Sequence, residues 1–296
     1  IKREHFQLVH TNVGIVISSA LAAWCAGVPH LWHIRDWFQE FGALWRPYSA
    51  YIVAFSKKVI CVSRPIAGQF TQSPKVCVLH NGLDLAEFPP LSDQERVEAR
   101  RKFGFSSTDF VVGTVGRIKF VRKGQEYLLR AVRALQDQGF FIKVLLTGGA
   151  APGSEDHIPR MQQLARDLNL ENQVVFSGEL PDPRAAYAAM DIFVLPSAQP
   201  EPFGGVVLEA MAFGLPVIAT AIGGSPEQVV PEETGFLIPP ADPQSLAVKL
   251  RKLCEDPDLC IRMGRAGRQR IATQLSLDHT VNSISKAYME VVNKHS

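Results

Sequence analysis

The strongest constraint on the fold is an alternation between short apolar runs and longer segments of helical character. In the second half of the chain the apolar runs are nearly continuous in Val, Ile, Leu and Phe, and they cover residues 110–115, 142–147, 174–177, 192–195 and 216–219. Strands that are apolar on both faces are typical of a parallel sheet covered by helices on both sides. Helices are expected at 125–138, 158–168, 185–190, from Gly204 onward and at 277–293. The sequence therefore predicts an α/β fold.

The same alternation is present in the first 85 residues. Short strands are expected at 6–10, 29–34, 58–62 and 76–79, and helices at 14–26, 37–55 and 63–71. Pro89-Pro90 and the charged run from Asp93 to Lys102 then interrupt the pattern, as expected for a linker and a solvated helix at a domain boundary. We therefore predict two domains with open parallel sheets, at 1–92 and 93–275, and a C-terminal helix within 276–296.

Composition and charge exclude several classes of function. The formal net charge is +2, and Lys and Arg are spread along the chain, so we expect no nucleic-acid partner. The sequence has no run of about 18 apolar residues that would span a membrane, and its start lacks the apolar centre of a signal peptide. The five cysteines, an odd number without C-x-x-C spacing, are expected to be free buried thiols in a reducing compartment. We therefore expect a cytoplasmic protein without a metal site.

The most informative stretch is 194–220, where a Pro- and Gly-rich loop and a helix connect two apolar strands. Gly204 and Gly205 stand where the loop becomes the helix. Glycine allows a backbone to approach a ligand closely, and the first turn of a helix favours an anion. Glu201 precedes this turn and Glu209 follows it. The stretch therefore predicts a phosphate site flanked by two carboxylates.

Two cations follow the strand at 110–115. Gly116-Arg117 comes directly after the strand, and Lys123-Gly124 opens the next helix. Arg as a planar fork and Lys as a point charge suit a diphosphate. The alternative is that both are ordinary solvated cations, but their combination with the helix start at Gly204 favours the diphosphate.

Glu201 and Glu209 are expected to have separate roles. Their spacing crosses a loop-to-helix boundary, so they should not share one helical face or act as an acid–base pair. Hydrogen bonds to sugar hydroxyls for Glu201 and to a ribose for Glu209 are more natural, and a solvated carboxylate is the alternative for each.

His33 ends the strand at 29–34, and open α/β sheets bind ligands in the crevice at the carboxyl ends of their strands. We therefore expect His33 to face that crevice and to have a functional role. His10 ends the preceding strand in a similar way, but a structural role is favoured for it.

Two other motifs can be explained by structural roles alone. Ser225 and Gln228 are in capping-box register after Gly223-Gly224, and a contact with a ligand stays open there. Trp37, Phe41 and Trp45 are four residues apart, which favours core packing; contact of Trp37, Phe38 and Trp45 with a membrane or an acceptor lipid is the alternative.

Two sequence patterns of nucleotide-binding proteins are absent. The segment 113–116 is too short for a dinucleotide fingerprint, and the glycine-rich segment 148–153 lacks the lysine of a P-loop. Asp-Pro pairs at 182, 242 and 256 predict helix caps, and we interpret Asp258, which extends the last pair to an acidic triplet, in the same way.

Together these residues resemble the family-4 retaining glycosyltransferases, which have the GT-B fold with two Rossmann-like domains. The resemblance extends from about Leu8 to Ala272. Its motifs are Glu-x7-Glu at Glu201 and Glu209, GR…KG at 116–117 and 123–124, NG-x-D at 81–84, and a glycine-glycine loop at 223–227 that is one residue short.

The resemblance implies a hexosyltransferase-like enzyme that moves a sugar from a nucleotide-diphosphate sugar, such as a UDP or GDP sugar, to a sugar or lipid-linked acceptor. It implies retention of configuration and no metal or other cofactor. Arg117 and Lys123 would hold the diphosphate, Glu201 the sugar hydroxyls, Glu209 the ribose, and His33 would reach the sugar near its reacting carbon. Further donor contacts are expected from Gly116, Leu180, Phe203, Gly204, Gly205 and Val206. The last helix would cross back to the first domain.

One departure concerns the first domain. The family's first domain begins with a strand and a glycine-rich loop, whereas this chain starts at Ile1, so we expect that domain to be incomplete, as in a fragment or a reading frame assigned too short. Unpaired sheet edge and apolar surface would then be exposed. A non-catalytic nucleotide-sugar-binding module is therefore the alternative function. A phosphorylase or epimerase of the same fold is less favoured, because no motif for a pyridoxal-binding lysine is present.

Overall fold

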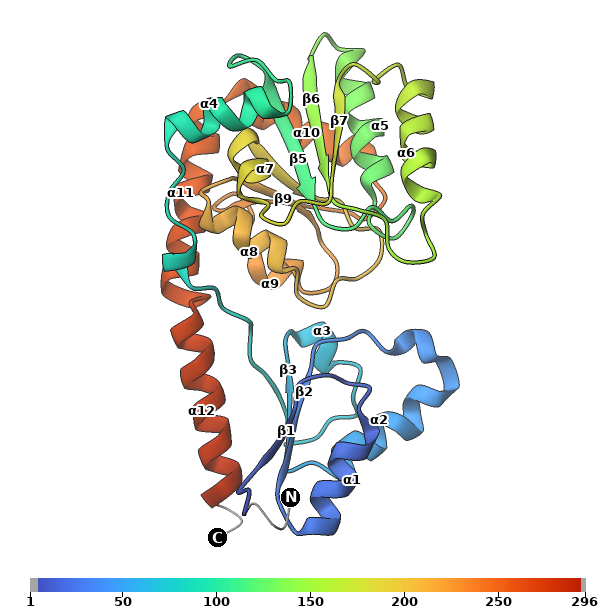
Figure 1. Ribbon diagram of the computed structural model, residues 1–296, viewed down its shortest axis with the longest axis vertical. Coiled ribbons are helices and arrows are strands. Elements are labelled where there is room, and N and C mark those ends of the chain that lie inside the picture. Colours follow the sequence, from blue (N-terminus) through green and yellow to red (C-terminus); the bar gives the residue numbers. More distant parts are fainter. Residues whose placement is uncertain (1–4, 294–296) are drawn as a thin grey trace. The chain divides into compact units, whose positions relative to one another are not determined.

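The computed structural model describes residues 5–293, which form two compact units (Figure 1). Unit 1 comprises the described residues of Ile1–Asp84, Pro200–Gly204 and Gln274–Ser296, and unit 2 comprises Leu85–Gln199 and Gly205–Thr273. These units differ from the predicted domains in three places, of which the smallest is that unit 2 ends at Thr273 and not at residue 275. The change from the first to the second falls at Asp84, and the loop 200–204 groups with unit 1.

Unit 1 is built on a four-stranded parallel sheet in the order β1-β2-β3-β4. The strands are β1 (Val9–Thr11), β2 (His30–Ile34), β3 (Lys58–Cys61) and β4 (Val76–Val78). The helices are α1 (Ile17–Ala26), the 3-10 helix η2 (Gln39–Leu44), α2 (Trp45–Ala54), α3 (Arg64–Ala67) and α12 (Leu277–Asn293). Ala287 and Val291 of α12 pack on Leu31 and Ile60 of the sheet. The C-terminal helix is therefore part of the core of unit 1.

The helix expected at 37–55 is wrong as a single element. Gly42, with φ 56° and ψ −131°, interrupts the helical backbone within η2, three residues before α2 begins, and only glycine adopts this conformation without strain. Phe38 stacks on Trp45 with ring centroids 5.0 Å apart, and both side chains are buried, whereas Phe41 is half exposed. Core packing is therefore confirmed for Trp45 and is wrong for Phe41. Membrane or lipid contact is wrong for Phe38 and Trp45, because their own unit covers both side chains.

Unit 2 is built on a six-stranded parallel sheet in the order β10-β9-β8-β5-β6-β7. The strands are β5 (Phe110–Val115), β6 (Ile142–Thr147), β7 (Val174–Gly178), β8 (Ile192–Leu195), β9 (Val217–Thr220) and β10 (Gly235–Ile238). The helices are η3 (Leu85–Glu87, 3-10), α4 (Asp93–Lys102), α5 (Gln125–Gln136), α6 (His157–Asp167), α7 (Arg184–Ala189), α8 (Gly205–Ala212), α9 (Ser225–Gln228), α10 (Pro243–Glu255) and α11 (Pro257–Gln274). The predicted α/β class with two parallel sheets is confirmed.

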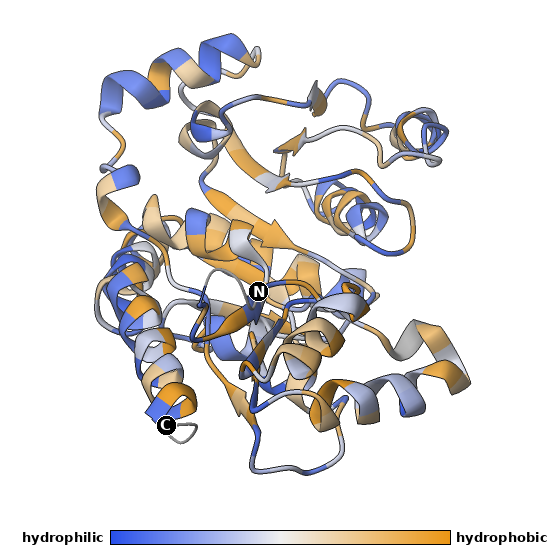
Figure 2. Ribbon diagram, turned by 60° about the horizontal axis from the view of Figure 1, so that its bottom comes forward, coloured by the Kyte–Doolittle hydropathy of each residue, from blue (hydrophilic) through white to orange (hydrophobic). Residues whose placement is uncertain are grey.

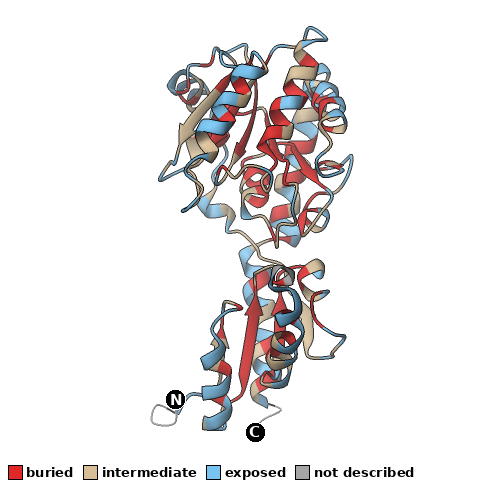
Figure 3. Ribbon diagram, turned by 90° about the vertical axis from the view of Figure 1, so that its right-hand side faces the viewer, coloured by how far each residue is buried: buried red, intermediate tan, exposed pale blue. Residues whose placement is uncertain are grey.

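Burial on both faces explains the near-continuous apolar strands. In Figure 2 the strands are mainly orange, whereas the helices carry both colours. Most strand residues are also buried (Figure 3). One core cluster joins β5, β6 and β8 to α5, α6 and α10, and α7 packs against β5 beside α4. The sheet of unit 2 is therefore covered by helices on its two sides.

The helix caps follow the sequence in two of the predicted motifs. Asp242 Oδ1 accepts hydrogen bonds from the backbone N–H groups of Gln244 and Ser245, and Asp256 Oδ1 accepts one from Leu259 at 2.8 Å. The interpretation of the acidic triplet as a helix cap is confirmed. The capping box at Ser225 is wrong, because Gly224 is the N-cap of α9 and makes no side-chain cap hydrogen bond.

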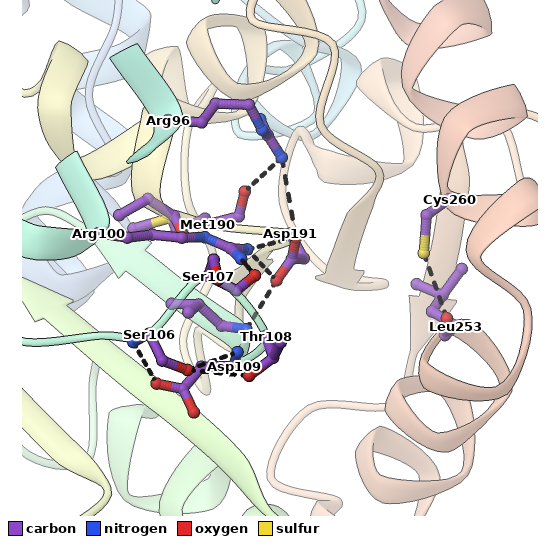
Figure 4. A network of polar contacts seen from close by, with 12 residues as sticks. Arg96, Arg100, Ser106, Ser107, Thr108, Asp109, Met190, Asp191, Leu253 and Cys260 are labelled. Atoms are coloured by element: carbon purple, nitrogen blue, oxygen red, sulfur yellow. Dashed lines mark hydrogen bonds and ion pairs between the residues drawn. The ribbon is translucent and has the colours of Figure 1, made fainter. Parts of the chain in front are cut away.

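A partly buried ion pair connects α4 to the strands of unit 2 (Figure 4). Nη2 of Arg100 lies 2.7 Å from each carboxylate oxygen of Asp191, and the backbone N–H of Val111 donates to Oδ2 at 2.8 Å. Arg96 Nη2 lies 3.7 Å from Oδ1. Burial raises the pKa of Asp191, against the opposing effect of these donors and charges. The pair therefore fixes α4 to the start of β5 and of β8.

Candidate functional site

The strand order of unit 2 places a topological switch at the carboxyl edge of its sheet. From β5 the chain runs outward through β6 and β7, then returns to β8 on the other side of β5 and continues to β9 and β10 (Figure 1). Open parallel sheets bind ligands outside the carboxyl ends of their strands at such a switch. A binding site is therefore expected where the loops after β5 and β8 leave the sheet.

The loops after β5, β6 and β7 are joined by backbone hydrogen bonds. Gly116 N–H donates to Thr147 O, Ile118 N–H to Gly149 O, and Gly148 N–H to Gly178 O, each at 2.9 Å. Gly116 and Gly148 both have φ near +137°. A Cβ at Gly148 would lie 2.1 Å from the carbonyl oxygen of Gly116, whereas one at Gly116 would meet nothing within 4 Å. Gly148 therefore permits close packing, and the space beside Gly116 is open.

The loop 117–124 carries both predicted cations. Arg117 is exposed and Lys123 is half-buried. The carbonyl oxygen of Arg122 accepts hydrogen bonds from Ala198 and Gln199, at 3.1 and 3.2 Å. This loop after β5 is therefore fixed to the segment after β8, which continues along the chain into the loop 200–204.

The contact between these two loops also requires a glycine at position 124. Its φ is +68°, and a Cβ there would lie 1.9 Å from the carbonyl oxygen of Pro196. The glycine that follows Lys123 in the KG motif therefore allows the loops after β5 and β8 to pack directly on each other.

Helix α8 begins with an exposed Gly205, and a Cβ there would meet nothing within 4 Å. Its first turn thus presents backbone N–H groups beside open space, the arrangement that favours an anion. Glu209 lies one turn further along α8, half-buried, and the hydroxyl group of Tyr187 donates to its Oε2 at 2.8 Å. Burial raises the pKa of Tyr187 well above its usual value, and the charge of Glu209 adds to this effect. Tyr187 therefore stays a donor and holds the carboxylate in place.

Leu180 and Val206, the other predicted donor contacts of unit 2, are both half-buried. Leu180 follows the end of β7 by two residues, and the neighbouring Glu179 carboxylate lies near Gly149, where a Cβ would be 3.4 Å from its Oε2. Leu180 is thus next to the joined loops. Val206 is the second residue of α8, and its carbonyl oxygen also accepts from Tyr187, at 3.4 Å.

The loop 200–204 lies in unit 1 and carries Glu201, Phe203 and Gly204. Glu201 and Gly204 are half-buried, and the buried ring of Phe203 stacks on His80 with centroids 5.2 Å apart. Thr280 Oγ1 donates to the carbonyl oxygen of His80 at 3.0 Å. The stacking fixes the position of Phe203. The backbone of Phe203 and of Gly204 is predicted to contact the sugar-nucleotide donor.

The NG-x-D segment has a structural role in unit 1. A Cβ at Gly82 would lie 2.0 Å from the carbonyl oxygen of Ser276. Leu83 N–H donates to Leu275 O at 2.9 Å, and Leu277 N–H donates to Leu83 O at 3.1 Å. Gly82 therefore lets this segment pair directly with the residues that lead into α12.

His33 lies in β2 with its ring buried, 1% exposed, rather than open to solvent. It stacks on His10 with centroids 5.7 Å apart, and His10 Nδ1 is hydrogen-bonded to the hydroxyl group of Tyr288 at 2.6 Å. Burial, and then the charge of Arg35, lower the pKa of His33 to about 3, so the ring is neutral near pH 7. Its Nε2 has no hydrogen-bond partner among the described residues.

Three further predictions concern metal ligands, membrane-spanning helices and cysteines. Among the side chains that the structure describes, no group of three or more His, Cys, Asp or Glu could hold a metal ion. No helix within residues 5–293 is long and apolar enough to cross a membrane. All five cysteines are free; Cys61 is buried and three others are half-buried, but Cys25 is exposed, so the prediction of a buried thiol is wrong there.

Sequence reasoning missed three residues of this site. Gly148 is one glycine in a run whose only recognisable pattern is an incomplete P-loop, and its φ near +137° cannot be read from the sequence. Tyr187 lies in an expected helix, but nothing in the sequence indicates its contact with Glu209. Glu126, whose Oε1 accepts from the backbone N–H of Val121 at 2.9 Å, follows the KG pair, and this adjacency was the only available signal.

Comparison with known proteins gives matches across both units. Residues 95–270 match the model of "Glycosyl transferases group 1", and residues 1–87 match that of "Glycosyltransferase Family 4". A D-inositol 3-phosphate glycosyltransferase of Corynebacterium jeikeium is 34% identical over 230 residues, which cover 76% of this chain and 54% of that protein. The chain thus spans about half the length of the curated relatives it matches.

Two solved structures of HepE from Anabaena share the fold. The complex with UDP has a TM-score of 0.88 at 26% identity, and the complex with UDP-glucose has a TM-score of 0.87 at 27% identity. Each match covers 96% of this chain and 79% of the HepE chain.

Proposed function

This chain belongs to the glycosyl transferases of group 1 and has the GT-B fold, and from this premise we propose that it transfers a sugar from a UDP-sugar. The acceptor is a hydroxyl group of a sugar or of a lipid-linked saccharide. The anomeric configuration is retained, and no metal ion takes part. UDP is proposed as the nucleotide because HepE, similar over nearly the whole chain, forms complexes with UDP and UDP-glucose.

The observation that carries this proposal is the contact between the loops after β5 and β8 at the topological switch of unit 2. The hydrogen bonds from Ala198 and Gln199 to the carbonyl oxygen of Arg122 fix the loop of Arg117 and Lys123. The same switch is followed by α8, which begins at Gly205 with open space at its N-terminus. Two cations and a helix N-terminus are the groups that a diphosphate needs.

The proposed step is a substitution at the anomeric carbon. The bond between that carbon and the diphosphate oxygen breaks, a bond to the acceptor oxygen forms on the same face, and the acceptor proton passes to the departing phosphate. Negative charge develops on the leaving group, and Arg117, Lys123 and the N-terminus of α8 stabilise it. No carboxylate is needed as a nucleophile.

The remaining residues are assigned to recognition of the donor. Glu209, held by Tyr187, accepts hydrogen bonds from the ribose, and the backbone at Leu180 contacts the base. Glu201 binds hydroxyl groups of the transferred sugar.

A second candidate is a nucleotide-sugar-binding module without transfer activity. It is favoured by the position of the proposed diphosphate-binding groups, because Arg117, Lys123 and the first turn of α8 all lie in unit 2. Both candidates bind UDP through the same groups of unit 2, so turnover distinguishes them.

The test combines calorimetry with UDP and GDP and a transfer assay with UDP-glucose. Binding of UDP together with sugar transfer supports the enzyme, whereas binding without transfer supports the module. Lys123→Ala is expected to reduce turnover about 10²-fold, the usual loss for one group that stabilises developing charge. Lys143→Ala is the matched control, because Lys143 lies near the amino end of β6 and donates to Asn172 O. Normal turnover of the Lys123 variant would contradict the proposed role of the cation.

A further inference from the structure

The loop between Arg117 and Lys123 contains a strained residue. Val121 has φ +67°, in the left-handed region, and it is the one β-branched residue with positive φ among those the structure describes. Left-handed backbone is a genuine outlier for a β-branched side chain, and such strain persists only where the surroundings enforce it. The side chain of Val121 is exposed, 54%, so its own packing does not enforce this conformation.

The group that holds Val121 is the carboxylate of Glu126. Oε1 of Glu126 accepts a hydrogen bond of 2.9 Å from the backbone N–H of Val121. Glu126 is the second residue of α5 and only 4% exposed, a buried position at which the positive end of the helix favours a carboxylate. The carboxylate also accepts a hydrogen bond from the backbone N–H of Glu126 itself, so it joins the preceding loop to the first turn of α5.

Further contacts transmit this conformation to Lys123, two residues later. Lys123 N–H donates to Lys119 O at 3.0 Å, which closes the turn around Val121. The carbonyl oxygen of Arg122, between the two, accepts from Ala198 and Gln199 after β8. A change of φ at Val121 would therefore change the direction of the chain at Lys123 and break the contact between the two loops.

We propose that Glu126 is a positioning residue of the diphosphate site, which acts by holding Val121 in the left-handed conformation so that Lys123 is directed to the leaving group. This inference rests on the proposed function, in which Lys123 binds the diphosphate. Burial raises the pKa of Glu126, with backbone hydrogen bonds opposing the shift, in agreement with an enclosed carboxyl group at this position.

The experiment measures UDP affinity of the full chain by calorimetry. Glu126→Ala removes the acceptor and is expected to raise the Kd for UDP about tenfold, as for loss of one hydrogen bond to a charged group. Glu126→Gln keeps an acceptor oxygen and should stay within about twofold of the wild type. Val121→Asn in the Glu126→Ala background should restore most of the affinity, because asparagine is favourable in the left-handed region.

Two comparisons separate positioning from a general loss of stability. Leu253→Ala opens a cavity in the core of unit 2 at a fully buried position of α10 and should leave the Kd unchanged. In the Lys123→Ala background, Glu126→Ala should add little, because both changes remove the same interaction. If Glu126→Ala does not fold, Glu126→Asp replaces it, since aspartate keeps the charge but is too short to reach Val121.

The outcomes are distinct for the inference and for the proposed function. If the wild type binds UDP and Glu126→Ala binds it equally well, the inference is wrong and the proposed function stands. An unrescued Val121→Asn double variant, or full additivity with Lys123→Ala, also overturns the inference. If the wild type does not bind UDP, both fail.

Discussion

The hydroxyl group of Tyr187 donates a hydrogen bond of 2.8 Å to Oε2 of Glu209, and thereby connects α7 to α8. Tyr187 is fully buried, and its ring lies against Phe193 and Phe213. The surroundings thus fix the donor, and the donor fixes a carboxylate that is itself half-buried. Glu209 is presented in one orientation before any nucleotide binds.

Tyr187→Phe should weaken UDP binding without unfolding unit 2. Phenylalanine keeps the ring packing and removes only the hydroxyl group that orients Glu209. Loss of this hydrogen bond should weaken the binding free energy of UDP by about 1 kcal/mol, which raises the Kd about fivefold. Calorimetry with UDP measures this change, and turnover at saturating donor should stay near that of the wild type. An unchanged Kd would show that the tyrosine does not orient Glu209 for the ribose.

Gly148→Ala should destabilise unit 2 by at least about 3 kcal/mol, because φ near +137° is strained for alanine and its Cβ would lie 2.1 Å from Gly116 O. Gly139→Ala is the matched control: its φ is +87°, but nothing lies within 4 Å of the new Cβ. That variant should cost only about 1 kcal/mol. Urea unfolding followed by circular dichroism compares the two; equal losses would argue against close packing of the loops.

Asp191→Ala should lower the free energy of unfolding of unit 2 by about 3 kcal/mol, because it leaves Arg100 partly buried without its partner. Glu255→Ala removes the exposed pair with Arg251, in which both side chains are about half exposed, and should change stability by less than about 1 kcal/mol. The same urea experiment measures both. Similar small losses would mean that the Arg100 pair is no more than a surface contact.

Unit 1 should lose stability as the pH falls below about 6.5. Burial lowers the pKa of His30 to about 4 and that of His33 to about 3, so between these values and about 6.5 the unfolded chain binds more protons than the folded one. Stability is then complete above about pH 6.5 and decreases by up to about 1.4 kcal/mol per pH unit for each histidine.

Tryptophan fluorescence measures this effect selectively, because all four tryptophans lie within the first 45 residues, in unit 1. His33→Asn should reduce the slope of stability against pH by less than half, because the pKa values of His10 and His30 are lowered as well. Above about pH 7, where both histidines are neutral in either state, the two slopes should coincide. If the slope at pH 5 is the same in the variant and the wild type, His33 does not contribute to the pH dependence of stability.

The sequence predicted the parts of the fold that depend on burial alone. The strands at 110–115, 142–147 and 192–195 have the predicted bounds, and the C-terminal helix covers 277–293 as expected. These elements are apolar on the faces they bury, so periodicity and composition are enough to locate them. The class of fold follows from them.

Periodicity and composition do not predict elements that depend on a single backbone angle or on a partner distant in the sequence. Gly42 breaks the expected helix at 37–55 through one unusual conformation. β10 was not predicted, and it is completed by pairing with β9. At the site, the glycines and cations came from motifs, whereas the contacts made by Tyr187 and Glu126 depend on how separate helices pack.

The pairing of Leu83 with the residues around Ser276 has a consequence for biosynthesis. Unit 2 has all its residues once the chain has been synthesised to Thr273, but unit 1 still lacks α12, whose Ala287 and Val291 complete its core. Domains generally fold in the order in which they leave the ribosome. For these two units the order should be reversed, because one side of the sheet of unit 1 stays uncovered until the ribosome has synthesised α12.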